Sequence, residues 1–175
     1  RFLNHDNGWA KPSVWLPALQ DRDQQTRTTV TSVVISRARS FTSKVMTALI
    51  ESSHTDVRRF AANCLALVTP ALAEEFLLDL LIDEKVEVRS AALRSVGVRR
   101  PPQWALVMER SLQDKELLIQ RVALESLLND RQGISILLKF VQNRPSHPLG
   151  AVIRAELANR SVVVYFAVPA HGQVI

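Results

Sequence analysis

An internal period of 31 residues constrains this chain more than any other feature of its sequence. The segment that begins at Ser53 aligns with the one that begins at Glu84, and a further step forward or backward finds the same apolar class at nearly every position. The aligned columns are Thr26, Val57, Val88 and Ile119; Val30, Ala61, Ala92 and Ala123; and Val34, Leu65, Val96 and Leu127. A weaker fifth copy follows Ser146-His147. Self-similarity at such a period is typical of stacked repeat architectures.

A second apolar pattern precedes each of these columns within its unit. Its members are Val45, Met46, Leu49 and Ile50, then Phe76, Leu77, Leu80 and Leu81, then Val107, Met108, Ser111 and Leu112. The spacing i, i+1, i+4, i+5 marks one face of a helix. Each unit is therefore predicted to contain a helix A, a tight polar turn and a helix B. We expect five such pairs, at 13–20 with 26–38, 40–52 with 55–68, 71–82 with 86–98, 102–113 with 117–129, and 132–143 with 149–160.

The turns carry signals for where these helices begin. Pro70 and Pro101 occupy equivalent positions, and we expect both to begin an A helix, because proline is tolerated at the first helical position. Ser53 or Thr55, and Asp83, are predicted N-caps of B helices, each contributing about 1 kcal/mol.

The composition agrees with an all-helical chain. It is 47% hydrophobic with only 5 Gly and 6% aromatic residues, which argues against disorder and against a loop-rich sandwich or barrel. Since one helix pair cannot bury its apolar face alone, the pairs must stack around a continuous core. The fold class predicted is all-α, an α-α superhelix of about five pairs. We expect 1–12 to be an N-terminal connection, 13–160 the array, and 161–175 an apolar tail or cap.

A recurring signal, D-x(5)-R-x(2)-A, connects the turn to helix B. Asp83 with Arg89 and Ala92 shows it in full, and Asp21 with Arg27 keeps the spacing. In this respect the chain resembles the HEAT-like (armadillo-type) helical repeat family. The resemblance covers roughly 13–160; the acidic position is Ser52 in one unit and the arginine position is Gln120 in another.

This resemblance implies a right-handed solenoid whose B helices line the concave side, and a scaffold role for protein partners. A second class, implied by fold analogy alone, is nucleic-acid binding like that of HEAT-like DNA alkylation-repair glycosylases. HEAT-like bilin lyases are a third class, which nothing in this sequence singles out.

Three arginines stand at the start of successive B helices. We interpret Arg27, Arg58 and Arg89 as a structural ladder, in which each arginine pairs with the inter-helix aspartates Asp21 and Asp83 or with turn carbonyls. The alternative is a row of anion-binding groups.

Signals of catalysis are sparse. The sequence has no Gly-rich phosphate loop, nucleophile elbow or HExxH motif, and its four histidines stand far apart, with His54 expected to help cap a helix. Cys64 lies on a predicted buried face, where it would act as a small hydrophobe. We therefore expect no enzymatic activity, no cofactor and no metal. The lone cysteine and the lack of a membrane-length apolar run favour a soluble, cytoplasmic protein.

The outward columns of the B helices suggest where a partner would bind. They contain Thr28, Arg59, Ser90 and Arg121, and then Ser32, Asn63, Arg94 and Glu125. The formal net charge is +5. We expect Arg59, Arg94 and Arg121, with Asn63 and Glu125, to bind a protein partner that carries acidic segments. The alternative is that this surface is solvated and binds no partner. Nucleic-acid binding would need a denser stripe of basic residues.

Two further features leave alternatives open. Trp15 falls in a core column and is expected to be packed, whereas Trp104 is either packed or an exposed binding anchor. Val162 to Val168 has strand character and could cover the last helix pair or add to the edge of a partner's sheet.

Overall fold

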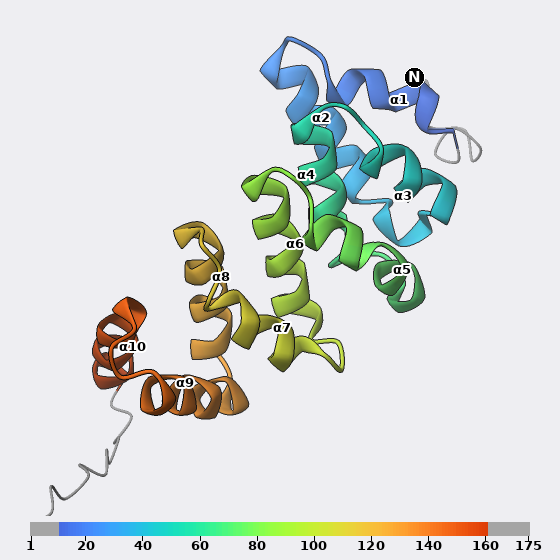
Figure 1. Cartoon of the computed structure of the whole chain (residues 1–175). Coiled ribbons are helices and arrows are strands. Elements are labelled where there is room, and N and C mark those ends of the chain that lie inside the picture. Colours follow the sequence, from blue (N-terminus) through green and yellow to red (C-terminus); the bar gives the residue numbers. More distant parts are fainter. Residues whose placement is uncertain (1–10, 161–175) are drawn as a thin grey trace, which may run out of the picture.

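The structure is a computed structural model, and it describes residues 11–160. Within this range it is all-helical, and helices A and B alternate along the chain (Figure 1). The A helices are α1 (Pro12–Leu19), α3 (Ser43–Ile50), α5 (Pro70–Leu81), α7 (Trp104–Ser111) and α9 (Arg131–Asn143). The B helices are α2 (Gln24–Ile35), α4 (Thr55–Cys64), α6 (Val86–Arg99), α8 (Leu117–Leu128) and α10 (Pro148–Asn159). The predicted α-α solenoid of five helix pairs is confirmed.

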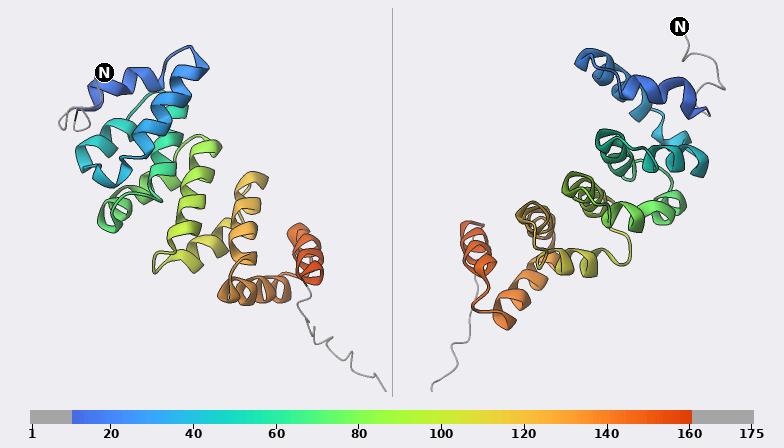
Figure 2. Two further views of the ribbon diagram at one scale, coloured as in Figure 1. Left: turned by 180° about the vertical axis from the view of Figure 1, so that it is seen from behind. Right: turned by 45° about the horizontal axis from the view of Figure 1, so that its top comes forward.

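The pairs stack side by side into a curved array. Figure 2 shows the B helices α4, α6 and α8 along the inner side of the curve and the A helices α3, α5 and α7 along the outer side. The strongest packing joins successive B helices, α4 to α6 and α6 to α8. The N-terminal and C-terminal helix pairs lie at opposite ends of the array (Figure 1).

The core runs between the two layers and follows the repeated columns. The members at positions 57, 88 and 119, at 61, 92 and 123, and at 65, 96 and 127 are all buried. The middle column is alanine in each of these three units, and small side chains allow neighbouring B helices to approach closely. Trp15 is also buried, as expected. The apolar surface is thus spread along a stacked core rather than gathered in one globule.

Helix boundaries depart from expectation where local backbone preferences intervene. The predicted helix 26–38 ends at Ile35 and is followed by the 3-10 turn η1 (Ala38–Ser40). The predicted helix 55–68 ends at Cys64, and Thr69 is extended with ψ of 152°. That conformation is the one favoured immediately before a proline, here Pro70, so the chain must leave the helix before that point.

The two prolines expected to begin A helices behave differently. Pro70 is the first residue of α5, as predicted. Pro101 is not the first residue of α7, which begins only at Trp104. Arg100 ends α6 in the left-handed conformation with φ of 51°. Pro102 then disfavours a helical backbone at Pro101, so the helix must start later.

The predicted N-caps are wrong as well. The residues at the N-cap positions are His54 for α4 and Lys85 for α6, and neither accepts a hydrogen bond with its side chain. Asp83 lies two residues earlier, where its Oδ1 accepts the Lys85 N–H at 2.8 Å. Side-chain caps are present elsewhere: Asp23 accepts the Thr26 N–H, and His147 accepts the Leu149 N–H.

Candidate functional site: the inner B-helix surface and its turns

The turns before the B helices α2, α4, α6 and α8 share one hydrogen-bond pattern. The residue at the ladder position donates from its side chain to the carbonyl oxygen six residues earlier. The four bonds are Arg27 to Asp21 at 2.7 Å, Arg58 to Ser52 at 3.0 Å, Arg89 to Asp83 at 2.8 Å and Gln120 to Asp114 at 2.6 Å. The glutamine amide therefore makes the bond that arginine makes in the other units.

The residue six positions earlier also uses its own side chain in the turn. Its oxygen accepts the N–H two residues on: Asp21 from Asp23, Ser52 from His54, Asp83 from Lys85 and Asp114 from Glu116. A short side chain with an acceptor oxygen is what such a turn needs. This explains why Ser52 can replace the aspartate of the repeated signal.

Arg58 makes a further contact that reaches the next unit. Its Nε donates to Asp83 Oδ2 at 2.7 Å and its Nη2 to Asp83 Oδ1 at 3.2 Å, and the two side chains are 11% and 9% exposed. The hydrogen bond to Asp83 raises the pKa of Arg58 against the effect of burial. Burial would raise the pKa of Asp83, but the bonds from Arg58 and the Lys85 N–H together lower it. The pair is ionised on both sides and ties α4 to the turn before α6.

The five residues expected to bind a partner are all exposed on the B helices. Arg59 and Asn63 lie on α4, Arg94 on α6, and Arg121 and Glu125 on α8. Ser90, placed in the same outward row, is instead buried at 2% exposure. Its hydroxyl donates back to the Glu87 carbonyl at 3.1 Å, and this short side chain does not reach solvent as the arginines of its row do.

Most of the five predicted residues line two separate hollows rather than one. The first, of about 360 Å³, lies between α2 and α4 and is lined by Thr28, Ser32, Arg59 and Asn63 among others. The second, of about 290 Å³, lies between α6 and α8 and is lined by Arg94, Val98, Glu125 and Asn129 among others. Arg121 lines neither of these two hollows, so the predicted site residues do not converge on one spot.

The charges on this surface are only partly neutralised. Arg59 pairs with Asp56 at 2.9 Å, one helical turn away, and Arg121 pairs with Glu125 at 2.8 Å. Exposed pairs of this kind contribute little, about 0.3–0.5 kcal/mol on a helix. The Arg94 side chain makes no hydrogen bond or ion pair with any residue of 11–160. Its guanidinium is available to an incoming acceptor.

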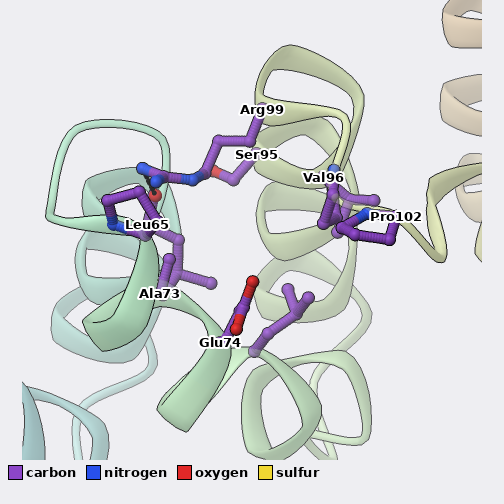
Figure 3. A pocket seen from close by; sticks show the side chains of 10 residues that line it. Leu65, Ala73, Glu74, Ser95, Val96, Arg99 and Pro102 are labelled. Carbon is purple, nitrogen blue, oxygen red and sulfur yellow. Dashed lines mark hydrogen bonds between the residues drawn. The ribbon is translucent and has the colours of Figure 1, made fainter.

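Two further arginines, for which the sequence indicated no structural role, connect the C-terminal ends of successive B helices. Arg99 of α6 donates to the carbonyl oxygens of Leu65 and Val68 at 3.0 and 2.7 Å. Arg160 donates to the Leu128 carbonyl at 3.0 Å. Arg99 thus satisfies carbonyls just beyond the end of α4, and Arg160 satisfies the carbonyl of the last residue of α8. Figure 3 shows Arg99 extending from α6 toward Leu65, beside a pocket of about 210 Å³ between α5 and α6.

Cys64 and Trp104, considered for catalysis and for partner binding, are both core residues. Cys64 is fully buried, and burial raises the pKa of its thiol to about 12, so it is not a thiolate at neutral pH. Trp104 is buried at 4% exposure, which overturns the alternative of an exposed anchor; its Nε1 donates to Ser126 Oγ. Between residues 11 and 160 no three His, Cys, Asp or Glu side chains cluster as metal ligands would.

The terminal segments carry two histidines, a tryptophan and the strand-like apolar run. Trp9, His5, His171 and the segment Val162 to Val168 lie outside the described residues. In the part of the chain that the structure describes, no helix has the length and apolar character needed to cross a membrane.

Comparison with known proteins identifies the repeats. Residues 42–128 match the family model of HEAT repeats, which spans the units from α3 to α8. No curated protein matches the chain. HEAT repeats generally serve as scaffolds for protein interactions, and the family is typically non-enzymatic. The units from α3 to α8 are therefore HEAT repeats, which confirms the resemblance predicted from the sequence.

Proposed function

We propose that this chain is a non-enzymatic interaction scaffold that binds a protein partner on the inner surface of its B helices. The observation that carries the proposal is Arg94, an exposed guanidinium without a partner in residues 11–160. It lines the α6–α8 hollow together with Val98, which is 73% exposed. A charged donor beside an exposed apolar side chain suits a peptide that carries a carboxylate next to an apolar residue.

The other exposed arginines add to this surface. Arg59 and Arg121 are held only by weak exposed ion pairs within their own helices. Exchanging such a pair for a partner's carboxylate costs little, because the pair itself contributes little. The surface is therefore suited to an acidic segment laid across α4, α6 and α8.

The test is affinity capture with a charge-reversed variant. We expect Arg59→Glu with Arg94→Glu to keep the helical circular dichroism spectrum and to lose most of the partner captured by the wild-type chain from source lysate. The matched control is Lys44→Glu with Lys139→Glu, which changes the charge equally on the exposed side of α3 and α9. Equal capture by wild type and the arginine variant would remove the inner surface from the proposal.

Nuclease treatment of the lysate separates the two partner classes. A protein partner is retained after treatment, whereas capture that depends on nucleic acid is lost. Mobility shift of a DNA duplex and an RNA hairpin at low and moderate salt provides the second measurement, because binding driven by phosphates weakens steeply with salt. A salt-sensitive shift by the purified chain would favour the nucleic-acid class instead.

A further inference from the structure

The third unit exposes two large apolar side chains that its neighbours lack. Leu78 and Ile82, at the end of α5, are 69% and 78% exposed. One period earlier the same columns hold Thr47 and Glu51, and one period later they hold Glu109 and Gln113. Because the three units share one packing scheme, the fold does not require apolar residues at these positions. Leu78 and Ile82 are therefore candidates for a contact outside the array.

A hollow of about 350 Å³ lies beside these side chains, between α5 and α7. Leu78, Ile82 and Val107 supply apolar lining, and Arg89, Arg110 and Asp114 supply charge. We call this surface the α5–α7 groove. Its lining comes from the A helices α5 and α7 together with residues of α6 and α8, and it shares no residue with the two hollows of the inner surface.

The ladder arginines differ at this step of the array. One unit earlier, Arg58 reaches across to the carboxylate of the next turn, Asp83. Arg89 instead donates to the carbonyl oxygens of Asp83 and Glu84, within its own turn. Within residues 11–160 it forms no ion pair with Asp114, the equivalent carboxylate of the next turn. Arg89 and Asp114, which both line the groove, are therefore not joined as Arg58 and Asp83 are.

The lining of the groove also carries a positive charge. The Arg110 guanidinium is exposed and makes no hydrogen bond or ion pair with the described part of the chain. Asp114 is the single carboxylate of the lining against two guanidinium groups, and its Oδ1 accepts the Glu116 N–H. An occupant that complements this lining needs apolar side chains for Leu78 and Ile82 and a carboxylate for Arg110.

We propose that the α5–α7 groove docks a short amphipathic segment of a protein partner, with two large apolar side chains flanked by Asp or Glu. This goes beyond the inner-surface function, because it places a second contact on another side of the array. The two proposals can fail independently, since they share no residue.

The test is selection of a random-peptide phage library on the full chain, with counter-selection on the Leu78→Thr, Ile82→Gln double variant. Both substitutions introduce residues that neighbouring units carry at these columns, so the fold should be retained, as circular dichroism would verify. We expect enriched peptides to pair large apolar residues with Asp or Glu. A labelled synthetic copy of an enriched peptide should bind the double variant at least about tenfold more weakly than wild type by fluorescence anisotropy, because two apolar side chains lose their burial.

Single variants then separate charge from apolar contact. Arg110→Glu should weaken peptide binding more at low salt than at high salt. Gln113→Ala, which changes the residue one period after Ile82, should leave the peptide affinity unchanged. The proposal is overturned if no peptide is enriched, if enriched peptides lack acidic residues, or if they bind the double variant as tightly as wild type. It is also overturned if the wild-type chain dimerises in sedimentation runs and Ile82→Gln abolishes the dimer, since the groove would then belong to a second copy.

Discussion

The bridge between Arg58 and Asp83 can be separated from the turn contacts by exchanging arginine for glutamine. Gln120 shows that a glutamine at the ladder position still donates to the turn carbonyl. Arg58→Gln should therefore keep the bond to Ser52 and lose only the bridge. Arg89→Gln is the matched control, because the hydrogen bonds of Arg89 go to turn carbonyls alone.

The magnitude follows from the burial of the pair. Its two side chains are 11% and 9% exposed, so removing Arg58 leaves a nearly buried carboxylate without its cation. Removing one partner of a buried pair costs about 3–5 kcal/mol, and a net hydrogen bond to a charged group contributes about 1.5–3 kcal/mol. Because this pair lies at the edge of the core, we expect Arg58→Gln to lower the free energy of unfolding by about 3 kcal/mol. Arg89→Gln should lower it by about 0.5 kcal/mol, the lower end for a neutral hydrogen bond.

Urea denaturation followed by circular dichroism measures both costs, provided that the m-values agree. A double-mutant cycle with Asp83→Asn isolates the pair: the double variant should be more stable than the sum of the single losses predicts, by about 1.5 kcal/mol or more. Hydrogen exchange should show the loss in α4 and α6 first. Equal costs for Arg58→Gln and Arg89→Gln, or additive losses in the cycle, would refute the reasoning.

Two other predictions concern pH and backbone packing. The pKa of Asp83 is lowered in the folded chain. Its contribution to stability is therefore present above the unfolded pKa, about 3.9, and is lost as pH falls through the lower folded value. We expect the difference in urea midpoint between wild type and Asp83→Asn to shrink below about pH 4. A Cβ at Gly133 would lie 2.2 Å from the Leu127 carbonyl oxygen, whereas one at Gly150 would meet its nearest atom, on Arg154, at 3.5 Å. Gly133→Ala should cost about 2–3 kcal/mol by overpacking, while Gly150→Ala should be neutral or stabilise by up to about 1 kcal/mol; equal thermal midpoints for the two variants would contradict this.

Much of the fold follows from local pattern. The spacing of apolar residues fixes which face of each helix is buried, so the helix pairs and core columns could be read from the chain alone. The same holds for the burial of Cys64, which stands among the core columns of α4. The positions of Pro101 and the N-caps were harder, because Pro102 and the turn side chain of Asp83 compete with the simpler start signals.

The sequence by itself determined the period, the alternation of helices and the core columns, because these depend on contacts that repeat within each unit. Only the tertiary structure decided which unit an arginine bridges to, since Arg58 and Arg89 are equivalent in sequence but differ in their reach toward the next turn. It likewise decided that Trp104 and Ser90 are buried and that the inner surface is divided into two hollows. These outcomes depend on the distances between neighbouring helices, which the packing of whole units sets and a periodic pattern does not contain.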